Sequence, residues 1–313
     1  MKYLRAFLIV SRYEFMLGGV FFLFFVSALA SKTWLQLRVN LPLIVLGSCV
    51  WFLSHLIGSQ VNCLADYQID LAFKQHLSTS VDRLGRRTIV FLLLIETALA
   101  LACSIQITRM TGRPILTALW IFGWLLTGFY SLEPVRLKRR GLWNPISLTL
   151  VLYVLPIVFG YLALTTNSDP LVILVLFSTG IQMLSLILMN EVEDIPEDSA
   201  QAVYTPFVIY GVWPVSFVCL TLFLLGAVGT LIGLTLLIDQ RVIQTAFLGI
   251  ALMGQWIVAR DLHRLVAVAK HQSATGGGAT SILNVIRTLG GRNSLHFGIL
   301  GITIAAGRAL TLN

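Results

Sequence analysis

The sequence predicts an all-α polytopic membrane protein with about nine membrane-spanning helices. Two observations carry the helical membrane part of this prediction. Hydrophobic residues make up 57% of the 313-residue chain and charged residues only 12%, with a mean hydropathy of +0.86. Soluble domains carry roughly 25% charged residues. The apolar residues also form runs of about 20, the length that crosses a bilayer as a helix. A soluble enzyme and a disordered chain are therefore excluded.

Nine apolar segments mark the expected helices. They lie near residues 13–31, 41–62, 88–107, 115–130, 145–165, 170–190, 212–238, 241–260 and 293–311. Only helices and closed barrels satisfy the backbone hydrogen bonds in lipid, and these runs are too long and continuous for barrel strands. We therefore expect one transmembrane domain over residues 1–313.

The net charge of +8 comes from basic residues in the short loops between these segments. The N-terminus and the loops after the second, fourth, sixth and eighth segments hold 16 Lys and Arg residues, and the opposite side holds 6. By the positive-inside rule, the N-terminus and these loops are cytoplasmic. In a bacterium the protein would lie in the inner (plasma) membrane. Because topology explains the basic residues, we expect membrane lipid around the protein and no nucleic-acid partner.

Half of the 14 acidic residues lie in two short segments that follow apolar runs. Residues 62–70 read NCLADYQID and residues 190–198 read NEVEDIPED, so both follow N-x-x-x-D-x-x-x-D. In a continuous helix these positions share one face. The copies are 128 residues apart. An internal repeat of four helices, over about 1–140 and 141–262 with a ninth helix added, would explain this spacing.

Carboxylates crowded on one face repel one another unless a cation holds them together. The second segment contains no Lys or Arg between Asn190 and Ser199. Mg²⁺ binds one or two carboxylates and completes its coordination with water and phosphate oxygens. We therefore expect Mg²⁺ as cofactor; the alternative is solvated loop acids that share a spacing by chance. The expected metal ligands are Asp66, Asp70, Asp194 and Asp198.

A basic loop lies between the two acidic segments. Residues 130–141 read YSLEPVRLKRRG. Such a loop either sets the topology or forms a cationic cradle for a phosphate leaving group. His55 is a further polar residue, on the same expected helical face as Asn62 and Asp66. It lines the cavity or forms an interhelical hydrogen bond.

The two acidic segments, with Thr205-Pro206 and Gly211 after the second, and the basic loop together resemble the UbiA superfamily of intramembrane prenyltransferases. The resemblance implies a helical bundle with a cavity open to lipid. It also implies that Mg²⁺ holds an isoprenyl diphosphate, whose prenyl group is transferred to a lipophilic acceptor with release of diphosphate.

The resemblance assigns roles by position in this sequence. The implied catalytic residues are Asp66, Asp70, Asp194, Asp198 and Tyr130. The implied diphosphate-binding residues are Asn62, Lys74, Ser131, Arg136, Lys138 and Asn190, with Lys74 reaching the phosphate if the helix continues past Asp70. Cys63 replaces an Asp common in the family, and no Arg-Pro pair follows the first segment. The acceptor therefore stays open.

Two other functions also stay open. A UbiA-type cyclase would convert the prenyl diphosphate into a terpene without any acceptor. A cation or metabolite transporter would use the same carboxylates, although transporters place their sites near the bilayer midplane on broken helices. Here the acids lie at helix ends. The sequence does not indicate the length of the prenyl group or the oligomeric state.

Overall fold

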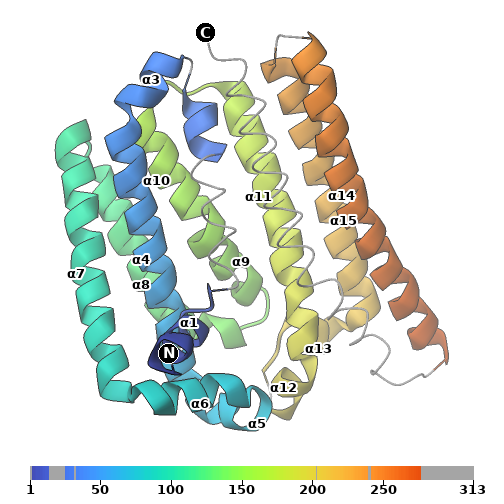
Figure 1. The fold of residues 1–313 in the computed structure, drawn as a ribbon. Helices are drawn as coiled ribbons and strands as arrows, with labels where there is room; N and C mark the ends of the chain where they lie inside the picture. Colours follow the sequence, from blue (N-terminus) through green and yellow to red (C-terminus); the bar gives the residue numbers. More distant parts are fainter. Residues whose placement is uncertain (1, 14–24, 32, 202, 239–240, 276–313) are drawn as a thin grey trace.

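The computed structural model describes residues 2–13, 25–31, 33–201, 203–238 and 241–275. These residues form helices and contain no strand (Figure 1). In chain order the α-helices are α1 (Lys2–Val10), α3 (Trp34–Val39), α4 (Leu41–Ala65), α5 (Tyr67–Phe73), α6 (Gln75–Leu84), α7 (Arg86–Thr111), α8 (Ile115–Ser131), α9 (Trp143–Thr149), α10 (Leu155–Leu164), α11 (Pro170–Asn190), α12 (Ile195–Ala200), α13 (Pro206–Tyr210), α14 (Val212–Leu237) and α15 (Arg241–Thr275).

Five stretches among the described residues are long and apolar enough to cross a membrane. They are Leu41–Ala65, Arg86–Thr111, Trp143–Leu164, Pro170–Ala200 and Val212–Leu237, and Ile115–Ser131 is a shorter apolar helix. The all-α membrane prediction is therefore confirmed. Of the remaining expected segments, 13–31 is described in part, 241–260 lies within α15 and 293–311 lies outside the described residues. The count of nine spans stays a prediction.

The span from Trp143 to Leu164 is interrupted in its middle. A π-helical turn, Leu150–Val154, joins α9 to α10, and Pro156 lies in the first turn of α10. Proline cannot donate a hydrogen bond to the preceding turn and its ring crowds that turn, so a widened turn is the expected adjustment. Residues 151, 152, 155 and 156 of this interruption line the cavity described below.

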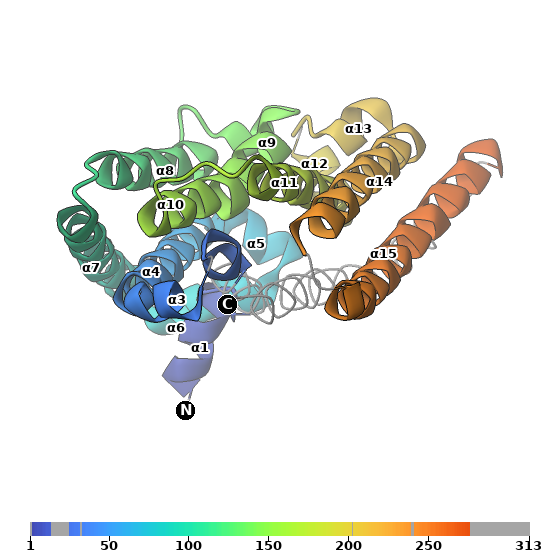
Figure 2. The ribbon, with the colours of Figure 1, turned by 90° about the horizontal axis from the view of Figure 1, so that it is seen from above.

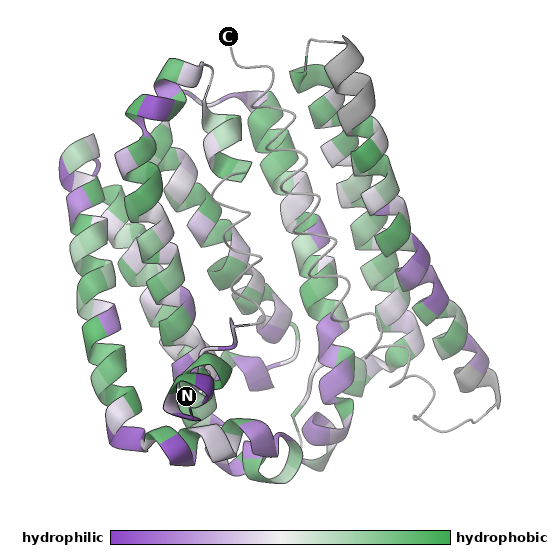
Figure 3. Cartoon of the chain, in the orientation of Figure 1, coloured by the Kyte–Doolittle hydropathy of each residue, from purple (hydrophilic) through white to green (hydrophobic). Residues whose placement is uncertain are grey.

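The short helices gather at one end of the bundle. Figure 1 shows α1, α5, α6 and α12 at the same end of the long helices, and Figure 3 shows that hydrophilic residues concentrate there. Seen along the bundle, α7, α8, α10, α11 and α14 follow one another in an arc (Figure 2). The N-terminal helix and the two acidic segments therefore share one face, as the charge distribution predicts. Its cytoplasmic orientation stays a prediction.

Helices α11 and α14 pack closely through a row of glycines on α14. A Cβ atom at Gly226 would lie 2.5 Å from the backbone oxygen of Ser178, and one at Gly233 would lie 2.5 Å from a methyl group of Val175. Gly229 faces the side chain of Ser178 in the same way. Small residues at such spacing let two helices approach in lipid, where packing drives association.

We expect Gly226→Ala to destabilise the protein by about 1–3 kcal/mol, because an overpacked contact forces the two backbones apart. Thermal unfolding of the detergent-purified protein measures the effect. Gly249→Ala is the matched control, since a Cβ atom there meets nothing within 4 Å. Equal melting temperatures for the two variants would contradict the packing described for α14.

Candidate active site

The first acidic segment spans a bend between two helices. Helix α4 ends at Ala65, Asp66 lies at the junction with φ −95° and ψ 5°, and α5 begins at Tyr67. Backbone hydrogen bonds continue across the junction, from Asp66 N–H to Asn62 O and from Asp70 N–H to Asp66 O. The expected straight helical face is therefore wrong, since the chain changes direction at Asp66. Lys74 lies in the turn after α5.

The second acidic segment is also bent. Helix α11 ends at Asn190, a 3₁₀ turn covers Glu191–Asp194, and α12 begins at Ile195. Pro196 lies in the first turn of α12, where its missing N–H has no partner to lose. The α-helix thus ends five residues before the first residue of α12, and the break precedes the proline.

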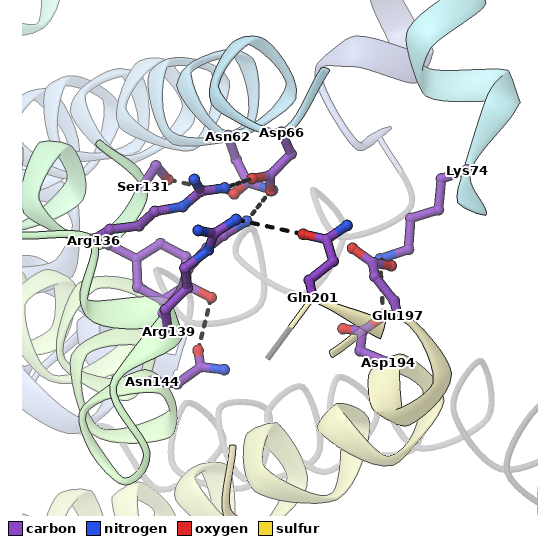
Figure 4. A network of polar contacts seen from close by, with 12 residues as sticks. Asn62, Asp66, Lys74, Ser131, Arg136, Arg139, Asn144, Asp194, Glu197 and Gln201 are labelled. Carbon is purple, nitrogen blue, oxygen red and sulfur yellow. Dashed lines mark hydrogen bonds and ion pairs between the residues drawn. The ribbon is translucent and has the colours of Figure 1, made fainter. Parts of the chain in front are cut away.

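Both segments line one cavity of about 410 Å³. At its polar end the cavity is lined by Asn62, Asp66, Asp70, Lys74, Tyr130, Lys138, Asn190, Asp194 and Asp198. Figure 4 shows Asp66 and Asp194 on opposite sides of this polar end. Two predicted site residues, Ser131 and Arg136, lie behind the wall and not on it.

From the polar end the cavity continues into an apolar chamber. The chamber is lined by Trp51, Trp120, Trp124, Val151, Leu155 and Phe159, among others. Along α4 the lining residues run from Gly47 to Asp66, a rise of about 28 Å at 1.5 Å per residue. His55 also lines the chamber; its Nε2 lies 3.4 Å from the Arg12 carbonyl oxygen and its ring stacks on Trp51.

The basic loop contacts the first acidic segment directly. Arg136 Nη2 lies 2.8 Å from Asp66 Oδ1, and Lys138 Nζ contacts Asp66 Oδ2. Arg136 also pairs with Glu133 at 3.1 Å. Both Asp66 and Arg136 are buried, so the charge of each is neutralised by the other. The loop therefore fixes the position of the Asp66 carboxylate.

Lys74 connects the two acidic segments. Its Nζ lies 2.9 Å from Asp194 Oδ1 and 2.9 Å from Glu197 Oε2 (Figure 4). The second segment has no Lys or Arg of its own, and its cationic partner is a lysine that follows the first segment. Burial lowers the pKa of Lys74, but the two carboxylates outweigh it and raise the pKa above its ordinary value.

Asp70, the second carboxylate of the first segment, is buried like Asp66. It is only 3% exposed, and burial followed by the nearby charge of Asp66 raises the pKa of its carboxyl to about 7. A nearby cation would favour the ionised form of this carboxyl group, because it offsets both burial and the repulsion from Asp66.

Polar contacts hold the wall of the polar end in place. The Tyr130 hydroxyl donates to Asn144 Oδ1 at 2.9 Å, and the Ser131 hydroxyl donates to Asn62 Oδ1 at 3.4 Å. Arg139 donates to Gln201 Oε1 at 3.4 Å. Asn144, Arg139 and Gln201 line the cavity. Arg139 belongs to the basic loop, whereas Asn144 and Gln201 lie outside the motifs, and their polar side chains close to the motifs were the only signal.

The donor chemistry of the polar end fits Mg²⁺. Among the described residues, six acidic side chains line the cavity against four basic ones, so this part of the wall carries an excess of hard oxygen donors. Among the described residues no three His, Cys, Asp or Glu side chains converge closely enough to hold a metal by themselves. Mg²⁺ requires only one or two protein carboxylates when phosphate and water supply the rest.

Fold and site together define a polytopic membrane protein with an internal cavity that is acidic at one end and apolar along its length. The family model of the UbiA prenyltransferase family matches residues 19–274, and the chain belongs to this family. The resemblance seen in the sequence motifs is thereby confirmed. No curated protein matches the chain by sequence.

Solved structures share the fold at low sequence identity. A digeranylgeranylglyceryl phosphate synthase matches 99% of this chain and 100% of its own, with 14% identity and a TM-score of 0.68. A UbiA homologue from Archaeoglobus fulgidus, bound to GPP and Mg²⁺, matches 96% and 99% with 16% identity and a TM-score of 0.63. One from Aeropyrum pernix K1 matches 93% and 96%, with 14% identity and a TM-score of 0.59.

Proposed function

We propose that this integral membrane protein transfers a prenyl group from an isoprenyl diphosphate to a lipophilic acceptor and releases diphosphate. One observation carries the proposal: the two N-x-x-x-D-x-x-x-D segments line a single cavity that continues into an apolar chamber. An amphipathic donor fits this shape, with its diphosphate at the polar end and its prenyl chain in the chamber. The GPP and Mg²⁺ bound to the Archaeoglobus homologue support the same reading.

The acidic residues have defined roles in this proposal. Asp66 and Asp70 on one side, and Asp194 and Asp198 on the other, would hold Mg²⁺ against the diphosphate. Bound there, Mg²⁺ supplies positive charge that stabilises the negative charge on the departing diphosphate. Asn62 and Asn190 lie one helical turn earlier and would donate amide hydrogen bonds to phosphate oxygens.

The basic residues divide into two roles. Lys74 and Lys138 line the cavity, so their ammonium groups can exchange a carboxylate for a phosphate oxygen when the donor binds. Arg136 does not line it and is buried against Asp66. We therefore assign Lys74 and Lys138 to the diphosphate and make Arg136 a positioning residue for Asp66. Ser131 positions Asn62 in the same way through their hydrogen bond.

The chamber would protect the reacting carbon. As the allylic C1–O bond breaks, the electron pair leaves with the diphosphate and positive charge develops on the prenyl group. Aromatic faces attract such charge, and the apolar wall excludes water that would capture it. Tyr130 lines the cavity together with both carboxylate segments, and we assign it to this role.

Incubation of the detergent-purified protein with isoprenyl diphosphates of several lengths tests the function. We expect diphosphate release that depends on Mg²⁺, stops on chelation with EDTA and returns when Mg²⁺ is added back. Mass spectrometry of products formed with a membrane lipid extract identifies the acceptor. A terpene formed without any acceptor would instead indicate a cyclase, and no diphosphate release from any donor would contradict enzyme function and leave transport.

A further inference from the structure

Glu191 is a buried carboxylate in the cavity wall that the proposed chemistry does not use. It is 6% exposed, and neither carboxylate oxygen has a hydrogen-bond partner among the described residues. The neighbouring acids differ. Asp66 pairs with Arg136 and Lys138, and Asp194 pairs with Lys74. A buried carboxylate without partners costs several kcal/mol unless a ligand satisfies it.

The place of Glu191 in the wall indicates which ligand that is. Met183, Ile187 and Glu191 follow one another at intervals of four along α11 and into the turn after it, and all three line the cavity. Residues at this spacing share one helical face. Glu191 therefore continues the cavity-lining face of α11 into the turn after the helix, next to the site of the proposed prenyl transfer.

A metal ion is a poorer occupant for this position. Glu191 lies at a variable position of the second segment, and the matching position of the first segment is Cys63, so Glu191 is not one of the carboxylates that the two segments share. Other buried acids do not share its situation: Glu96 accepts a hydrogen bond from Gln60 and does not line the cavity. A carboxylate that faces an apolar chamber is suited to accept a hydrogen bond from a hydroxyl group.

We propose that Glu191 binds the acceptor, accepting a hydrogen bond from a hydroxyl group at the reacting end of a lipophilic molecule. The inference rests on the proposed function and assigns to Glu191 the recognition of its second substrate. Glu191 then sets acceptor specificity, because an analogue without the hydroxyl leaves the buried carboxylate unsatisfied.

Saturation binding of two radiolabelled probes, 4-nonylphenol and its methyl ether, tests this with Mg²⁺ and inorganic pyrophosphate present. We expect the wild-type protein to prefer the phenol by about two- to tenfold, the range for a typical hydrogen bond. Glu191→Met should remove the preference by weakening phenol binding alone. Glu193→Met is the matched control, since Glu193 is exposed and does not line the cavity.

The melting temperature distinguishes an acceptor-binding role of Glu191 from a structural role. Removal of an unsatisfied buried carboxylate should raise the melting temperature of Glu191→Met by at least about 2 °C, whereas loss of a structural contact would lower it. A lower melting temperature, failure to fold, or a retained phenol preference would overturn the inference. So would no phenol preference in the wild type, or loss of Mg²⁺-dependent pyrophosphate binding in the variant. Diphosphate release from isoprenyl diphosphates tests the proposed function separately.

Discussion

Asp66→Asn and Asp194→Asn are each expected to lower kcat/KM for Mg²⁺-dependent diphosphate release by at least about a hundredfold. That loss corresponds to about 2.7 kcal/mol of transition-state stabilisation. Asparagine keeps the size of the side chain and removes the charge that would hold Mg²⁺. The two carboxylates lie on opposite sides of one cavity (Figure 4), so neither can replace the other. Rates measured over a range of Mg²⁺ concentrations test this.

Asp82→Asn is the matched control, because Asp82 is an exposed carboxylate at the same end of the bundle that contacts Tyr67 outside the cavity. Stability is followed in parallel. The Asp66 side chain is 7% exposed and that of Asp194 is 41% exposed, so only Asp66→Asn should lower the melting temperature markedly. Full activity in both folded variants would refute the assignment of these residues to Mg²⁺.

Arg136→Met is expected to lower the stability of the protein, whereas Lys138→Met is expected to lower its kcat. Arg136 is buried against Asp66 and outside the cavity wall, so its loss should destabilise the protein by about 2–3 kcal/mol. This is less than the ~3–5 kcal/mol typical of a broken buried pair, because Lys138 still neutralises Asp66. Lys138 lines the cavity, so its replacement should lower kcat about ten- to a hundredfold with a small change in stability.

Thermal unfolding and steady-state kinetics on the same preparations distinguish these outcomes. Arg140→Met is the control from the same loop, since Arg140 is exposed and donates to the Pro134 carbonyl oxygen. If Arg136→Met keeps its melting temperature and loses only kcat, Arg136 contacts substrate and is not a positioning residue.

The sequence predicted the helical membrane fold and the composition of the polar end well. Long apolar runs allow only one kind of secondary structure in lipid, so spans such as 86–111 and 212–237 could be placed closely. The repeated Asn and Asp spacing indicated one shared site, and both copies do line one cavity. Their roles in metal and diphosphate binding stay predictions.

The ion pairs could not be predicted from the sequence, because they depend on how the helices end. Lys74 reaches Asp194 only since the chain bends at Asp66 and turns again after α5. Spacing within a motif carries no information about such bends. Glu191 escaped notice for a related reason: among five acids in one short segment, only the packing of α11 distinguishes the buried one from its exposed neighbour Glu193.

The glycine contact between α11 and α14 limits where this protein can change shape. With Gly226 and Gly233 against the α11 backbone and Val175, a shift of α11 toward α14 would force backbone atoms into overlap. These close contacts involve residues 171–182 of α11 and lie before the 3₁₀ turn Glu191–Asp194 and α12. The ion pairs from Lys74 to Asp194 and Glu197 connect those two elements to the first acidic segment.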